Sequence, residues 1–136
     1  MTSVRRLVAC LSITAFAMTF STYAADDKDK KTPTTKEIMK KVPGKNGLVA
    51  KTSTAAKDGN WDEAQKDGKE LKTYSEALSK NVAKKGDKES WEKHTKGFSE
   101  IVTEIADGAD KKDNAAVQAG VKKFGATCKG CHDAHK

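Results

Sequence analysis

The sequence has few of the residues that favour sheets or sharp turns. Aromatic residues make up 6% of the chain, and only 2 prolines occur among its 136 residues. Runs of β-branched residues are rare, whereas Ala, Lys, Glu and Leu dominate the central part. Because β-branched and aromatic residues favour strands and the second group favours helices, we expect an all-α fold. The length suits one domain with a modest core.

Cysteine is also scarce, and its positions exclude a disulfide framework. Of the 3 cysteines, Cys10 lies in the first segment, while Cys128 and Cys131 lie close to the C-terminus. Disulfide-rich domains instead spread paired cysteines along the chain. Cys10 follows Leu-Val-Ala, as at a lipoprotein cleavage site, but it lies too close to Arg6 and the apolar stretch continues past it. We therefore do not expect lipidation there.

Residues 1–24 have the pattern of a secretory signal peptide. Arg5 and Arg6 supply a positive start, and residues 7–20 are uncharged and mostly apolar. Thr22-Tyr23-Ala24 then offers small residues at a cleavage site. Because the apolar stretch is short for a membrane span, we predict export to the periplasm without stable membrane insertion, a retained anchor being the alternative.

The chain is basic, with 26 Lys and Arg against 19 Asp and Glu. Removing residues 1–24 takes away two arginines and no acids, which leaves 24 against 19, or a formal charge of +5. The two signs are interspersed, and export removes nucleic acid from reach, so we expect no nucleic-acid binding. A basic surface of this kind attracts acidic partner proteins.

Four amphipathic segments follow a charged lead-in at residues 25–33, which we expect to be disordered. Thr34 and Glu37 have the spacing of a capping box, so a helix is predicted from there to Lys57. Pro43, Gly44 and Gly47 interrupt it, which predicts a kinked or broken helix.

The other three segments show apolar residues at alternating steps of three and four, which is helical periodicity. They predict helices from Asn60 to about Ala83, from Asp87 or Lys88 to Ala109, and from about Asn114 onward. Their short polar links favour an antiparallel four-helix bundle over residues 34–136. The predicted stripe of the second segment is Trp61, Ala64, Gly68, Leu71, Ser75, Leu78 and Val82.

No arrangement of acids and bases suggests catalysis, so we do not expect an enzyme. The carboxylates of the second segment resemble a solvated helix face with lysines nearby. They are Asp62, Glu63, Asp67 and Glu70.

The motif that carries chemistry is Cys128-Lys129-Gly130-Cys131-His132, which has the C-x-x-C-H pattern of c-type haem attachment. Two thiols add to the two vinyl groups of one porphyrin, and a histidine directly after the second thiol can bind the iron. Both cysteines continue the apolar face of the last segment. The motif predicts one covalent haem c, with His132 as an axial ligand.

Two other uses of these residues are weaker. Cys128 and Cys131 could form a redox-active disulfide, but that motif normally lies in a βαβ unit, and none is predicted here. A zinc site would add His132 and His135, but the adjacent Cys131 and His132 would struggle to coordinate one tetrahedral ion.

The second axial position of the iron decides between two functions. A methionine there raises the reduction potential and suits electron transfer, whereas an empty apolar face lets nitric oxide or carbon monoxide bind. Met39 is the leading candidate because it is the only methionine after residue 24, although a methionine on an apolar helix face often only fills the core. His94 is the second candidate, with a structural role preferred.

Several neighbours of the motif have expected positions. His135 lies one turn beyond His132 and is expected at an exposed C-terminus. Four aromatic residues are candidates to flank the porphyrin, with core packing preferred for the first of them: Trp61, Trp91, Phe98 and Phe124.

A signal peptide, four helices and C-x-x-C-H on the last helix resemble the class II c-type cytochromes, the cytochrome c′ group. The resemblance covers residues 34–136 and implies thioether links at Cys128 and Cys131 with proximal ligation by His132. In low-spin members a methionine of the first helix is the sixth ligand, a place that Met39 matches. In five-coordinate members an apolar residue holds that place.

The resemblance leaves three hypotheses for function. The first is a periplasmic electron carrier with low-spin His132/Met39 iron and acidic redox partner proteins. The second is a five-coordinate haem protein that binds nitric oxide or carbon monoxide, and the third is an exported helical module without haem. Because members of the class often dimerise, a homodimer is also considered.

Overall fold

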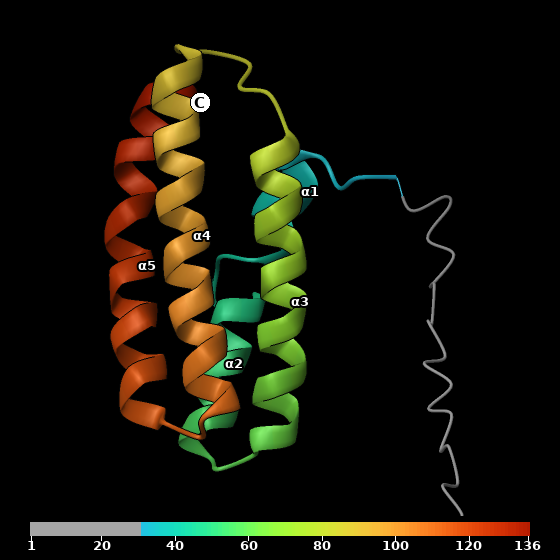
Figure 1. The fold of residues 1–136 in the computed structure, drawn as a ribbon, viewed down its shortest axis with the longest axis vertical. Helices are drawn as coiled ribbons and strands as arrows, with labels where there is room; N and C mark the ends of the chain where they lie inside the picture. The colour runs from blue at the N-terminus through green and yellow to red at the C-terminus, as the bar shows by residue number, and fades with distance from the viewer. Residues whose placement is uncertain (1–30) are drawn as a thin grey trace, which may run out of the picture. The chain divides into compact units, whose positions relative to one another are not determined.

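The computed structural model describes residues 31–136, which form five α-helices and no strand (Figure 1). They are α1 (Thr35–Lys41), α2 (Leu48–Lys57), α3 (Trp61–Lys80), α4 (Lys88–Asp110) and α5 (Asn114–His135). The all-α prediction is confirmed. The predicted signal peptide and most of the lead-in at residues 25–33 lie outside the described residues. No helix within 31–136 combines the length and the apolar character needed to cross a bilayer.

Local capping fixes where the helices begin. The Thr34 side chain accepts from the Glu37 amide, and the Glu37 carboxylate accepts from the Thr34 amide at 2.7 Å, so the predicted capping box is present. Asn60 caps α3, and Asp87 caps α4. A side-chain cap of this kind stabilises a helix by about 1 kcal/mol.

The first predicted segment is broken into α1 and α2. Pro43 follows directly on the α1 C-cap, Val42, and has no amide hydrogen to continue the helix. A Cβ at Gly47 would overlap the carbonyl oxygens of Val42 and Pro43, so only glycine fits there. The Val49 amide donates to the Val42 carbonyl at 3.2 Å and closes the turn. Five helices therefore stand where four segments were predicted.

Three long helices, α3, α4 and α5, lie side by side, and successive ones run in opposite directions (Figure 1). Helix α2 packs against α3 and α5, whereas α1 packs against α3. Small residues permit the close crossings: Gly68 of α3 faces Ala106 of α4, and Gly120 of α5 faces Ile105.

The core consists of the apolar stripes that the sequence predicted, with one exception. The fully buried large side chains include Ile38, Val42, Leu71, Val102, Ile105 and Val117. Val82 was predicted to continue the α3 stripe but is 84% exposed. That prediction was wrong because α3 ends at Lys80, where Asn81 becomes extended and its side chain donates to the carbonyls of Pro33 and Ala77.

Asp67 also departs from its prediction. It was placed on a solvated face but is only 8% exposed, and its Oδ2 has no hydrogen-bond partner within the described residues. Burial, followed by repulsion from Glu63, raises the pKa of the Asp67 carboxyl. The helical period predicted that the acids of this segment face solvent, but the packing of α3 against its neighbours covers Asp67.

Replacing the fully buried Leu71 by alanine tests the core. We expect Leu71→Ala to lower the free energy of unfolding by about 2–5 kcal/mol, because it removes buried methyl groups and leaves a cavity. Urea unfolding measures the loss. Val82→Ala, at the exposed position, is the matched control and should change it by less than about 0.5 kcal/mol. Equal losses in both variants would contradict the assignment of the core.

Burial of the Asp67 carboxyl predicts the direction in which the free energy of unfolding changes with pH. Because its pKa is raised on folding, its ionisation opposes folding, and the cost grows as pH rises above the unfolded value of about 3.9. Asp67→Asn should therefore raise the free energy of unfolding at pH 7, and the gain should disappear as the pH falls below the unfolded carboxyl pKa of about 3.9. Urea unfolding at both pH values measures this. Glu76→Gln, an exposed change on the same helix, is the control; a pH-independent loss in Asp67→Asn would refute the account.

Candidate functional site

One cavity brings together the residues that the sequence selected. It has a volume of about 180 Å³ and is lined from α1, α3, α4 and α5 and from the turn after α1. The predicted residues Met39, His94, Cys128, Cys131 and His132 all contribute to its wall. The remaining lining residues are Pro43, Leu78, Lys93, Thr95, Gly97, Phe98, Phe124 and Thr127.

Helix α5 positions the two cysteines on one side. It continues without a break through the motif to His135, so Cys128 and Cys131 stand three residues apart on the same helix face. Both thiols are free and half-buried, and Cys128 Sγ donates to the Phe124 carbonyl at 3.3 Å. Burial, with a smaller effect of Cys128, raises the pKa of the Cys131 thiol. The folded chain therefore holds Cys131 mainly as the neutral thiol.

His132 follows Cys131 directly and also lines the cavity. Within residues 31–136 the structure records no hydrogen bond from its ring, so both ring nitrogens lack a protein partner there. In the same range, no three His, Cys, Asp or Glu side chains are arranged to hold a metal ion. The geometry therefore offers nothing in favour of the zinc alternative.

The aromatic candidates divide into two groups. Phe98 and Phe124 line the cavity, and their ring centroids lie 5.4 Å apart at a tilt of 59°. Trp61 and Trp91 do not line it. Trp91 is buried, and its indole N–H donates to the Asn81 carbonyl at 2.8 Å, which fixes the link after α3.

Met39 and His94 approach the cavity from different sides. Met39 is half-buried on α1, a helix that packs against α3. His94 of α4 instead lies beside the motif: a Cβ at Gly130 would stand 3.5 Å from its ring, and its ring meets that of His135 edge to face at 5.6 Å. Met39 and His94 therefore contribute to the cavity wall from two different helices, α1 and α4.

His135 is not the exposed terminal residue that the sequence suggested. Its Nδ1 lies 2.9 Å from the Lys85 carbonyl and its Nε2 lies 3.1 Å from the Ser90 hydroxyl. A carbonyl only accepts, so Nδ1 carries a proton, and in the neutral ring Nε2 accepts from Ser90. The ring also packs edge to face on Trp91. These contacts tie the last turn of α5 to the start of α4.

Gly86 makes this tie possible. Its φ is +77°, and a Cβ there would come within 2.6 Å of His135 Nδ1. Gly86 lies in the short polar link between α3 and α4. The requirement is visible only once the end of α5 is packed against that link.

The residues of the cavity fit a c-type haem. The two thiols share a helix face at the required spacing, and the imidazole beside the second has no competing protein partner within residues 31–136. The surrounding wall is largely apolar, with Leu78, Phe98 and Phe124 contributing. Apolar surroundings of this kind control solvent access to a bound iron.

Removing the His135 ring tests whether its contacts hold the last turn of α5 against the start of α4. His135→Ala should lower the free energy of unfolding by about 1–3 kcal/mol, because two hydrogen bonds and the Trp91 contact are lost. Hydrogen exchange of the backbone amides at residues 130–136 should become faster, while exchange in α3 should not. Lys136→Ala is the matched control at the exposed end. Unchanged exchange in His135→Ala would show that the contacts do not hold this turn.

The comparison with family models agrees with the site. The family described as Cytochrome C' matches residues 86–136, which contain α4, α5 and the whole C-x-x-C-H motif. Met39 and α1 to α3 lie outside the match. No curated protein and no solved structure matched the chain. Over residues 86–136 the match agrees with the resemblance seen in the sequence and supports a cytochrome c′-like, class II c-type cytochrome.

Proposed function

We propose that the chain carries one haem c, covalently attached at Cys128 and Cys131 and ligated by His132, and that it transfers single electrons in the periplasm. The observation that carries the proposal is the shared cavity, where Met39 of α1 and the motif of α5 line one largely apolar space.

Each group has a distinct task in this proposal. The two cysteine thiols hold the cofactor on α5, and His132 supplies the proximal nitrogen. Haem supplies an iron that accepts and releases one electron at a time. Leu78, Phe98 and Phe124 exclude water from the cavity, which tunes the reduction potential.

We further propose Met39 as the sixth ligand in preference to His94. A haem held by His132 would need a second protein ligand from elsewhere in the cavity wall to be six-coordinate. His94 stands next to Gly130 and His135, which belong to the same helix end as the motif. Met39 comes from α1, which packs against α3, and this separation from the helix end that carries the motif supports Met39.

The second candidate function is a five-coordinate haem protein that binds nitric oxide or carbon monoxide. It is favoured if Met39 remains a packing residue, since Met39 also contacts the hydrophobic core. An apolar face would then be left for small gases.

The proposal also includes the four-helix bundle, the signal peptide and the role of the chain as a carrier. We treat α1 and α2 as one broken helix of a four-helix bundle over residues 34–136, with residues 1–24 as the signal peptide. The chain would act as a carrier rather than as an enzyme.

An optical spectrum of the protein, exported together with haem-attachment machinery, tests this function. We expect sharp α and β bands in the reduced protein and a weak methionine-to-iron band in the oxidised protein. Met39→Leu, which removes the sulfur at similar volume, should lose that band and gain carbon monoxide binding. His94→Ala is the control and should retain the spectrum.

Two outcomes would redirect the proposal. A wild-type protein with broad high-spin bands that change with carbon monoxide would favour the gas-binding function. The variant Cys128→Ser/Cys131→Ser should contain no covalent haem after denaturation. A wild-type protein without covalent haem would leave the third hypothesis, a helical module.

A further inference from the structure

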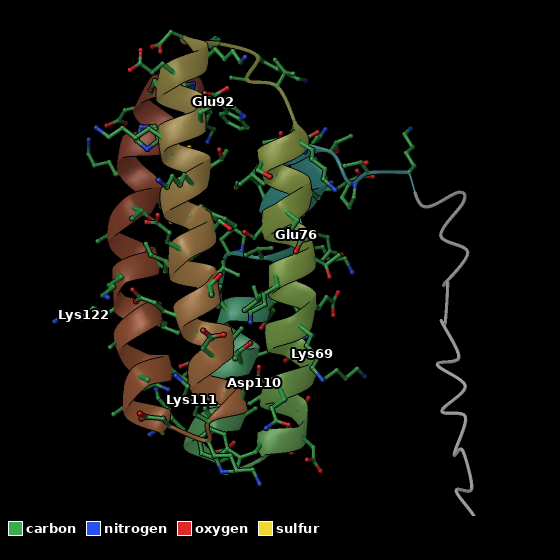
Figure 2. The ribbon with its side chains drawn as sticks, viewed as in Figure 1. Lys69, Glu76, Glu92, Asp110, Lys111 and Lys122 are labelled. Atoms are coloured by element: carbon green, nitrogen blue, oxygen red, sulfur yellow. The ribbon has the colours of Figure 1, made fainter. Side chains whose placement is uncertain are left out.

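The net positive charge of the described chain is confined to its first part. Residues 31–57 contain seven lysines and one acidic residue, Glu37, a formal charge of +6. Residues 58–136 contain 15 lysines and 15 acidic residues, a formal charge of zero. Both signs are intermixed on α3 to α5, where Lys69, Glu76, Glu92, Asp110, Lys111 and Lys122 project outward (Figure 2).

Four lysines of residues 31–57 lie in α1 or in the turn after it. We call them the α1 patch: Lys36, Lys40, Lys41 and Lys45. All four are exposed. Within residues 31–136, the recorded ion pairs involve lysines of α3 to α5 and none of the patch. Glu37, the acid of α1, accepts hydrogen bonds from Thr34, and the charge of Lys40 contributes to lowering its pKa. The four lysines of the patch therefore outnumber the one acid of residues 31–57.

The α1 patch borders the cavity. Met39, which lines the cavity, directly precedes Lys40 and Lys41, and Pro43, which also lines it, lies two residues before Lys45. The favourable interaction of cations with a helix C-terminus accounts for Lys40 and Lys41 but not for Lys36 or Lys45.

We propose that the α1 patch is the docking surface for an acidic redox partner protein, which exchanges electrons with this chain beside Met39. The proposal rests on the proposed function, since it names the partner of the same site. Unpaired cations beside the electron-transfer site orient an acidic surface and raise the association rate by about 10- to 1,000-fold. The rate should fall with added salt, because the screening length is about 8 Å at physiological ionic strength.

A protein partner fits the surface better than a membrane or a nucleic acid. Ile38 and Val42, in α1 and its cap, are fully buried, and the half-buried Met39 lines the cavity, so α1 offers no exposed apolar face to a bilayer. Among the described residues Val82 is the exposed large apolar side chain, and it lies beyond α3, outside the patch. Residues 31–57 contain no aromatic side chain on which a base could stack.

Stopped-flow oxidation of the reduced, haem-loaded protein by ferricyanide tests the charge at the site. One electron passes from ferrous protein to the trivalent anion, which becomes ferrocyanide. The variant Lys40→Glu/Lys41→Glu/Lys45→Glu should react about 10-fold more slowly at low ionic strength. Lys69→Glu/Lys111→Glu/Lys122→Glu is the matched control, with the same change of net charge away from α1, and should stay within about twofold. The difference should disappear at high salt.

Poly-L-glutamate serves as the acidic polypeptide probe. It should slow ferricyanide oxidation of the wild type and of the control variant but not of the α1 variant. If ferricyanide oxidised both triple variants equally slowly, the proposal would be overturned, because the rate would then depend on net charge and not on the α1 patch. Binding of wild type to phosphatidylserine vesicles through the patch, without binding of poly-L-glutamate, would overturn it in favour of a membrane.

The failure of this proposal and that of the proposed function are distinguishable. Calorimetric titration with poly-L-glutamate needs no electron transfer. If the spectrum shows no haem, the proposed function fails whatever the titration gives. If haem is present and poly-L-glutamate binds the α1 variant as tightly as the wild type, only the docking surface is refuted.

Discussion

The tight turn between α1 and α2 is the constraint on which the cavity depends. A continuous helix through residues 34–57 would carry α1 along the axis of α2, which packs against both α3 and α5. The turn releases α1 from that axis. Pro43 stops the first helix, Gly47 admits the carbonyls of the preceding residues, and the bond from Val49 to Val42 closes the loop. Met39 and Pro43 can then form one wall of the site while α2 fills the core.

The starts of the helices were predictable because capping is local. Thr34, Asn60 and Asp87 each bond a group three residues away, so the sequence contains the whole interaction. The end of α3 was not predictable in the same way. Asn81 turns there because it bonds Pro33, which is distant in sequence, and its carbonyl accepts from Trp91. The helical period continued to Val82, but the chain had already left the helix.

The residues of the candidate site also differ in whether local sequence alone could identify them. The motif at Cys128, Cys131 and His132 is readable from five adjacent residues. The role of His135 was missed because its partners, Lys85 and Ser90, are 50 and 45 residues away. Pro43 and Leu78 were noted as a helix breaker and a core residue, and only the packed structure places them at the cavity. Asp67 followed the polar side of its helix in sequence but is covered by neighbouring packing.

The separation of charge along the chain has a consequence for how the molecule moves toward others. Among the described residues, 31–57 hold the whole formal excess of positive charge, and 58–136 are balanced. The centre of positive charge is therefore displaced toward the side of α1 and α2, which gives the protein a permanent dipole moment. In the field of an approaching anion such a molecule rotates before contact. Collisions that begin with α4 or α5 facing the anion would thus be converted, by reorientation, into encounters at the wall that contains Met39.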